Sequence, residues 1–158
     1  MAVALTLKAL GVKRRLYLFD TFNGMTASDD KIDVDRFGAP VSAEILQYNI
    51  SPIEEVCSNM NSTGYTGPII YVAGDVLTTI PEKAPESIAL LRLDTDWHDS
   101  TEHELQYLFP KLSPGGILIV DDYGHWAGSK LATDEYFQSN RIPFERTMVG
   151  YSVLVHTR

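Results

Sequence analysis

The chain has 158 residues with 13 Lys+Arg against 21 Asp+Glu, which gives a formal net charge of −8. This length suits one domain over residues 1–158, and 44% hydrophobic with 22% charged residues is ordinary for a globular protein. The composition therefore excludes wholesale disorder and a membrane protein. The acidic balance argues against binding to nucleic acid or to anionic membranes, because both need a basic protein surface.

Signals for targeting and redox compartment are weak. The single cysteine, Cys57, excludes an internal disulfide and a zinc site built on thiolates. It favours a reducing compartment, so we expect a cytoplasmic location. The apolar start precedes the basic residues 13–15, which is the reverse of the order in a secretory signal. No run approaches the roughly 18 apolar residues that a membrane span needs.

The first forty residues predict a helix, a strand and a long polar connection. Ala, Leu and Lys dominate the start, and Gly11 ends the helical pattern. Arg15–Phe19 (RLYLF) predicts a short strand that closes at Asp20. The polar stretch Thr21–Pro40 is too long for an ordinary connection, so it predicts a lid or mobile loop.

Short apolar runs then alternate with helical patterns. The predicted elements are a helix over Ser42–Asn59 with Ser51 as N-cap, strands over Pro68–Ala73 and Ser87–Leu93, a helix over Ser100–Leu112 with Ser100 as N-cap, a strand over Ile117–Val120, a helix over Gly128–Asn140, and a hairpin of Thr147–Val149 with Ser152–His156. Because Ile117–Val120 is wholly apolar, we expect it to be buried on both faces. The alternation predicts an α/β fold with a mostly parallel sheet, right-handed crossovers and an antiparallel C-terminal hairpin.

Acidic residues stand at the end of four predicted strands: Asp20, Asp75, Asp94 with Asp96, and Asp121 with Asp122. Ligands of such sheets bind beyond the carboxyl ends of the strands, so the same edge collects at least six carboxylates. Crowded carboxylates repel one another, and a cation such as Mg²⁺, which prefers oxygen ligands, relieves that repulsion. Asp94, Asp121 and Asp122 are the best candidate metal ligands, since one helix joins their strands. The alternative is that each acid caps a helix or faces solvent.

Other residues at this edge have candidate roles with plain alternatives. A lone acid such as Asp20 commonly accepts hydrogen bonds from ribose hydroxyls, and Asp75 after Gly74 could lie beside an adenine ring. Either aspartate could instead simply form a turn. His98 and His125 follow acidic strand ends and could act as bases toward a substrate hydroxyl, or be polar loop residues.

Four stretches together resemble the macrocin O-methyltransferase family: Arg15–Met25, Ile88–Thr101, Leu112–Gly128 and Asp134–Phe137. The resemblance implies enzymes that depend on S-adenosylmethionine and magnesium and methylate hydroxyls on sugars of macrolides and related small molecules. It also implies a Rossmann-like class I methyltransferase sheet. The expected partner is therefore a small-molecule hydroxyl substrate.

The resemblance also implies roles for individual residues. It places cofactor binding at Asp20, Thr21, Gly74, Asp75, Val76 and Asp94, Mg²⁺ at Asp94, Asp121 and Asp122, and catalysis at Asp94, Asp96, His98 and His125. We expect Asp96, His98 or His125 to take the proton of the acceptor hydroxyl. His98 stands where the family pattern would have an aromatic residue such as tyrosine.

The chain departs from the family pattern at its start. The family begins with a strand and a glycine-rich turn before the first helix, whereas this chain opens in that helix and contains no G-x-G spacing. The absent strand would lie between those ending at Asp20 and Asp94, so we expect an N-terminally truncated domain. Its free edge invites pairing with another copy, which predicts a homo-oligomer.

Two other functions stay open. The truncation favours a non-catalytic or inactive fragment of such an enzyme. The D-x-D spacing of Asp94 and Asp96 superficially matches magnesium phosphohydrolases. That chemistry needs further strand ends before the last acidic pair, and only one helix separates Asp96 from Asp121.

Overall fold

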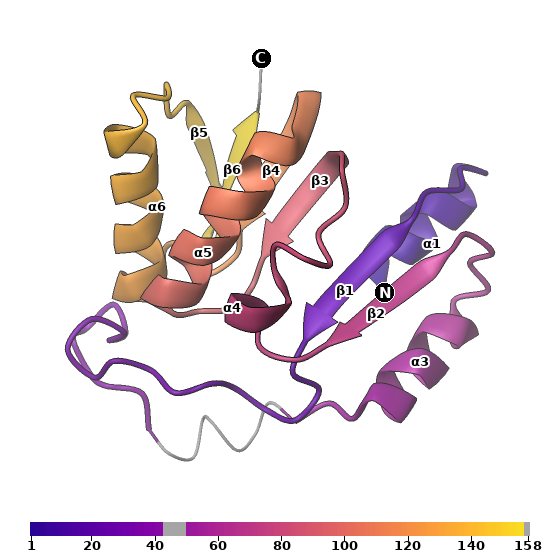
Figure 1. Cartoon of the computed structure of the whole chain (residues 1–158), viewed down its shortest axis with the longest axis horizontal. Helices are drawn as coiled ribbons and strands as arrows, with labels where there is room; N and C mark the ends of the chain where they lie inside the picture. The colour runs from indigo at the N-terminus through magenta and orange to yellow at the C-terminus, as the bar shows by residue number, and fades with distance from the viewer. Residues whose placement is uncertain (43–49, 157–158) are drawn as a thin grey trace.

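The computed structural model describes residues 1–42 and 50–156, which form two sheets (Figure 1). A two-stranded sheet pairs β1 (Leu16–Asp20) with β2 (Ile69–Ala73) in parallel. A four-stranded sheet has the order β3-β4-β6-β5, with β3 at Ile88–Leu93, β4 at Leu112–Val120, β5 at Arg146–Val149 and β6 at Ser152–His156. The β3–β4 pair is parallel, and β6 runs antiparallel to β4 and to β5. The α/β fold, with parallel strands first and an antiparallel hairpin last, is confirmed.

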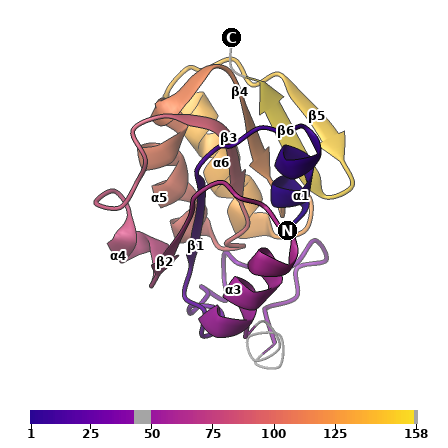
Figure 2. The same cartoon turned by 90° about the vertical axis from the view of Figure 1, so that its right-hand side faces the viewer.

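Helices lie on both sides of the strands (Figure 2). They are α1 (Ala2–Ala9), α3 (Ile53–Ser62), the single turn α4 (Val76–Thr79), α5 (His98–Leu108) with the 3₁₀ turn η1 (Phe109–Lys111), and α6 (Ala127–Ser139). In Figure 2, α5 and α1 stand on opposite sides of the strands. No helix in the described part of the chain is long and apolar enough to cross a membrane.

The core lies where the four-stranded sheet meets α5 and α6. Leu93 of β3, Leu118 and Val120 of β4, Leu105 of α5 and Phe137 of α6 are all buried there. Burial of each such side chain stabilises the fold by about 1.5–3 kcal/mol. This core fixes the carboxyl ends of β3 and β4 side by side, with Leu93 in register with Val120.

The opposite face of this sheet is less covered. Ile117 and Ile119 are only half-buried, and their neighbour Leu90 on β3 is 42% exposed. The prediction that Ile117–Val120 is buried on both faces was therefore wrong. Successive strand side chains point to opposite faces, and in the described residues helices bury only the face of Leu118 and Val120 fully.

The sheet is interrupted between β1 and β3. Figure 1 shows their arrows pointing toward the same end, yet no hydrogen-bonded ladder joins them within residues 1–42 and 50–156. The break falls between the strands that end at Asp20 and Asp94, where the sequence predicts an absent strand. Each of the two strands therefore presents a free edge.

Several predicted boundaries need correction. Helix α5 begins at His98 rather than Ser100, because the Ser100 hydroxyl donates to the carbonyls of Thr95 and Trp97 instead of capping the helix from outside. Strand β4 begins at Leu112 rather than Ile117, and its register with β3 shifts where Gly115 adopts a positive φ of 75°.

The N-terminal predictions are partly confirmed. The first helix is present as α1 and ends before Gly11. The predicted helix Ser42–Asn59 includes residues 43–49, which lie outside the described residues. Its described part, α3, begins at Ile53 after Pro52, so Ser51 is not its N-cap. Helix α4 was not predicted; the Asp75 side chain begins it by accepting from the Leu77 amide at 2.9 Å.

Candidate active site

A cavity of about 480 Å³ opens at the carboxyl ends of the parallel strands. Its lining comes from the ends of all four of them: Asp20 and Thr21 after β1, Gly74, Asp75 and Val76 after β2, Asp94, Thr95, Asp96 and Trp97 after β3, and Asp122 after β4. Gly24, Met25 and Thr26 add a wall from the connection that follows β1. The volume lies within the usual range for small-molecule sites, about 300–1,000 Å³.

Three carboxylates converge at one side of this cavity. Asp94, Asp121 and Asp122 each offer an oxygen, and these oxygens all lie within 4.8 Å of one another. The convergence follows from the β3–β4 register, which aligns the two strand ends. An all-oxygen set of this kind fits the preference of Mg²⁺ for carboxylate ligands.

Arg92 supplies a positive charge to the same cluster. Its two terminal nitrogens donate to Asp94 Oδ2 at 2.6 Å and to Asp121 Oδ2 at 2.7 Å. Ser152 on β6 donates to the other oxygen of Asp121 at 2.7 Å. Sequence reasoning missed Arg92, although residues two apart on a strand share a face and Arg92 precedes Asp94 by two.

Burial and mutual repulsion perturb the pKa values of these acids. Burial, followed by a hydrogen bond with Asp121, raises the pKa of Asp94 to about 6. Burial, together with hydrogen bonding to and repulsion from Asp122, raises the pKa of Asp96 to about 9. Burial alone would raise the pKa of Asp121, but the hydrogen bond from Ser152 and the interactions with Asp94 and Arg92 lower it. Even with Arg92 present, the cluster thus favours an additional cation.

A buried glutamate supports the loop that carries Asp94 and Asp96. Asp96 has a φ of 68°, in the left-handed region that costs a non-glycine residue energy. The preceding Thr95 donates its hydroxyl to Glu104 Oε2 at 2.8 Å, and its carbonyl accepts from Trp97 N at 2.8 Å. Glu104 is 5% exposed, and burial raises its pKa to about 8. Sequence reasoning missed Glu104, because nothing in the helix pattern marks it as buried.

Glu104 should make the stability of the fold depend on pH. Because its folded pKa of about 8 exceeds the ordinary value of 4.5, the stability that Glu104 contributes is fully present below pH 4.5 and is lost as pH rises through 8. We expect Glu104→Gln to remove this loss and to raise the free energy of unfolding at pH 8 by about 1–3 kcal/mol. Thermal unfolding from pH 5 to 8 measures the effect. The exposed neighbour Glu102→Gln should leave the wild-type pH slope, and an unchanged slope for Glu104→Gln would contradict the assignment.

The candidate cofactor residues line the other side of the cavity while making local turns. Asp20 Oδ1 accepts from the Phe22 amide at 2.8 Å, and Phe22 has a φ of 54°. The Thr21 hydroxyl donates to the Gly24 carbonyl. Gly74 has a φ of 134°, which only glycine adopts easily, and the following Asp75 caps α4. These residues therefore both form local turns and line the cavity.

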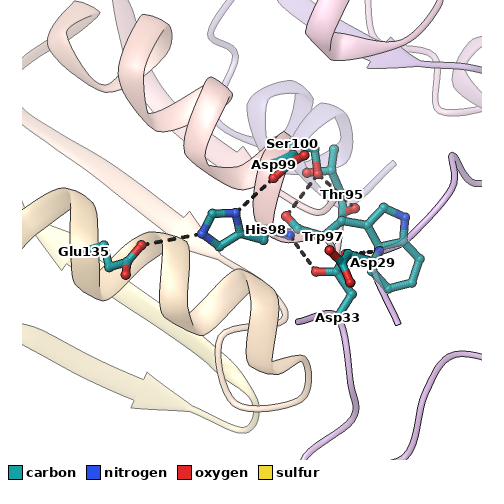
Figure 3. A network of polar contacts seen from close by, with 8 residues as sticks. All are labelled: Asp29, Asp33, Thr95, Trp97, His98, Asp99, Ser100 and Glu135. Atoms are coloured by element: carbon teal, nitrogen blue, oxygen red, sulfur yellow. Dashed lines mark hydrogen bonds and ion pairs between the residues drawn. The ribbon is translucent and has the colours of Figure 1, made fainter. Parts of the chain in front are cut away.

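The two candidate histidines lie elsewhere. The His98 ring extends from α5 toward α6, between Asp99 at 3.0 Å and Glu135 at 3.5 Å (Figure 3). Burial would lower the pKa of His98, but these two carboxylates raise it. The His125 ring stacks edge-on against Trp126 and Tyr151, with centroids 4.8 and 5.4 Å away. Of the four candidate catalytic residues, Asp94 and Asp96 line the cavity.

Parallel strands, an acidic cluster at their carboxyl edge and the adjoining cavity define a Rossmann-like α/β domain whose ligand site lies beyond the strand ends. The model of the family described as Macrocin-O-methyltransferase (TylF) matches residues 1–156. The chain therefore belongs to the macrocin O-methyltransferase family.

Curated relatives act in natural-product chemistry. Over 114 residues the chain is 31% identical to 8-demethyl-8-(2,3-dimethoxy-alpha-L-rhamnosyl)-tetracenomycin-C 4'-O-methyltransferase of Streptomyces olivaceus, covering 70% of this chain and 42% of that protein. Over 124 residues it is 31% identical to mycinamicin III 3''-O-methyltransferase of Micromonospora griseorubida, covering 74% and 47%. The chain thus spans less than half the length of these two relatives.

Solved structures agree on the fold. The O-methyltransferase NovP superposes with a TM-score of 0.82 at 28% identity, covering 96% of this chain and 64% of that one. TomG from Streptomyces achromogenes, solved in complex with SAM, shares the fold with a TM-score of 0.51 at 14% identity. The class I methyltransferase architecture expected from the sequence is therefore confirmed.

Proposed function

We propose that this domain transfers the methyl group of S-adenosylmethionine to a hydroxyl oxygen of a small molecule, with Mg²⁺ at Asp94, Asp121 and Asp122. The observation that carries the proposal is the convergence of these three carboxylates beside the cavity in a chain of this family. The relatives' names support a sugar hydroxyl of a natural product as the acceptor. A cytoplasmic location remains part of the proposal.

In the proposed reaction, the bond between sulfur and the methyl carbon breaks as the acceptor oxygen attacks from the opposite side. The sulfonium becomes a neutral thioether, and the hydroxyl proton passes to a base. The domain must align donor and acceptor and accept that proton. Asp20 with Thr21 would hold the ribose, and Gly74 to Val76 would border the adenine.

The acidic side of the cavity would activate the acceptor. When bound, Mg²⁺ supplies Lewis acidity that lowers the pKa of a hydroxyl. Asp96 is the base candidate that best fits the geometry, because it lines the cavity. Its pKa of about 9 keeps it protonated at neutral pH, and a cation held by the adjacent acids would lower that pKa and free the carboxylate to accept the proton. The rings of His98 and His125 point to other partners, so either could take the proton only after reorienting.

A second candidate is an inactive fragment, which the break between β1 and β3 favours. The strands on the two sides of that break end at Asp20 and just before Asp94, and both aspartates line the cavity. A second copy pairing at the free edges would close the break, which keeps a homo-oligomer within the proposal. The phosphohydrolase alternative has no support from the two relatives named above, which are both O-methyltransferases.

Calorimetric titration of S-adenosylmethionine, with and without Mg²⁺, tests the proposal. We expect a Kd near 1 μM, about −8 kcal/mol. Transfer of a labelled methyl group to a panel of glycosides should require Mg²⁺ and stop with excess chelator. A cooperatively folded chain that binds no S-adenosylmethionine would favour the inactive fragment, and turnover that survives chelation would exclude the metal role.

A further inference from the structure

One acidic residue of the connection between β1 and α3 has no role so far. Most residues from 21 to 40 are exposed or half-buried, but Asp33 is only 3% exposed. A buried carboxylate is costly unless its oxygens accept hydrogen bonds. Its partners therefore show what it holds in place.

Asp33 binds the start of α5 and closes its own turn (Figure 3). One carboxylate oxygen accepts from the amide of His98, the first residue of α5, at 2.8 Å. The other accepts from the Asp29 amide at 2.8 Å, and the Asp33 amide donates to the Asp29 carbonyl at 2.7 Å. One side chain thus joins residues 29–33 to a helix 65 positions further along the chain.

The start of α6 leaves room for this carboxylate. A Cβ on Gly128, in the first turn of α6, would collide with the Asp33 carboxylate and approach His98 N to 3.0 Å. The negative charge therefore lies against the N-terminal ends of two helices, whose dipoles stabilise it. Beside it, the Ala127 amide donates to the Val34 carbonyl at 2.8 Å, which adds a second attachment to α6.

The same connection forms a wall of the cavity. The Trp97 indole donates to the Thr26 carbonyl at 3.1 Å, and Met25 and Thr26 line the cavity with Asp94 and Asp96. On the other side of Asp33, Asp35 pairs with Trp126 in an isolated bridge. The wall is therefore continuous with the part of the chain that Asp33 fastens.

We propose that Asp33 is a positioning residue, which anchors residues 21–40 to the N-terminal ends of α5 and α6. In doing so it holds Thr26 against Trp97 and keeps Met25 and Thr26 in the wall of the cavity that Asp94 and Asp96 also line. The effect on the acceptor rests on the proposed function, whereas the anchoring can be measured without any catalysis.

Four variants test the anchor. Asp33→Ala removes both acceptors, and Asp33→Asn keeps one oxygen for the His98 amide. Gly128→Ala retains Asp33 but places a methyl group where its carboxylate lies. It should therefore displace the Asp33 carboxylate from the two helix starts without changing Asp33 itself. Asp30→Asn is the matched control, because it makes the same charge change on an exposed side chain of the same turn.

Two readouts need only the folded chain. Native trypsin cleavage after the exposed Lys31 and Arg36 reports release of this connection. Emission from the two tryptophans, Trp97 and Trp126, reports it too, because both are buried against it at 3% and 6% exposure. For Asp33→Ala and Gly128→Ala we expect cleavage at least about tenfold faster and red-shifted emission, with native far-UV dichroism. Asp30→Asn should match wild type. The cleavage rate and emission wavelength of Asp33→Asn should lie between those of wild type and those of Asp33→Ala.

A steady-state readout separates positioning from plain destabilisation. We expect the acceptor KM to rise by about tenfold in Asp33→Ala and Gly128→Ala, while the S-adenosylmethionine Kd stays within about twofold. Wild-type cleavage and emission in both folded variants would overturn the anchor, and an unchanged acceptor KM despite faster cleavage would overturn the positioning role. If the wild-type chain transfers no methyl group, the proposed function fails, but cleavage and emission still decide the anchor.

Discussion

Asp121→Asn should reduce Mg²⁺-dependent methyl transfer by about a hundredfold or more while leaving the fold intact. The substitution removes one of the three converging carboxylates, and an amide is a much weaker ligand for Mg²⁺ than a carboxylate. Its amide can still accept from Ser152, so the link to β6 is kept. Turnover measured against Mg²⁺ concentration and Mn²⁺ affinity by electron paramagnetic resonance check the prediction, and Asp94→Asn should behave alike.

The control for this experiment is Asp99→Asn. Asp99 lies in the first turn of α5 close to the acidic edge in sequence, but its side chain is 82% exposed and pairs with His98. It should leave Mn²⁺ affinity and the Mg²⁺ dependence unchanged. If Asp121→Asn binds Mn²⁺ as tightly as wild type, the three carboxylates do not form the metal site, and Arg92 would then be their resident counter-ion.

Asp20→Asn should weaken S-adenosylmethionine binding by about 10- to 100-fold. The asparagine oxygen can still accept from the Phe22 amide, so the turn after β1 is retained. Its amide nitrogen is a donor and cannot accept from a ribose hydroxyl as the second carboxylate oxygen can. Calorimetric titration against wild type measures the change in affinity.

The matched variants separate binding from turn formation. Asp20→Ala loses both oxygens, so it should weaken binding and also lower the unfolding midpoint. Asp30→Asn should change neither quantity. An Asp20→Asn protein with wild-type affinity would mean that Asp20 serves only to form the turn at Phe22, the plain alternative raised by the sequence.

Residues adjacent to predicted strands were the ones that the sequence could place. Asp94 and Asp121 follow apolar runs joined by a single helix, and such strands neighbour one another in parallel sheets. Their convergence within 4.8 Å with Asp122 is thus a consequence of local pattern and topology rules. The position of the break in the sheet came instead from the family resemblance, which implies a strand between those ending at Asp20 and Asp94.

Two predicted boundaries, the start of α5 and the start of β4, were wrong because local sequence signals allow more than one arrangement there. Ser100 has the residue type of an N-cap, yet its hydroxyl donates back to the carbonyls of Thr95 and Trp97, and the extended Trp97 precedes the helix instead. Residues 113–116 indicate the end of the preceding helix, so the sequence predicts the strand only from Ile117, whereas β4 runs through Gly115 and Gly116. Local propensity could not place the start of β4, because that start depends on the pairing of Leu112 with Ile88 on β3.

The sequence by itself determined the α/β class, the acidic edge and the family, since these depend on periodicity, strand ends and contiguous motifs. Only the tertiary structure decided that Arg92 bridges two of the acids, that Glu104 is buried beneath Thr95, and that Asp33 joins a connection to two helix starts. The physical reason is shared. Each of these contacts depends on burial or on the approach of separate elements, and the spacing of residues along a chain specifies neither.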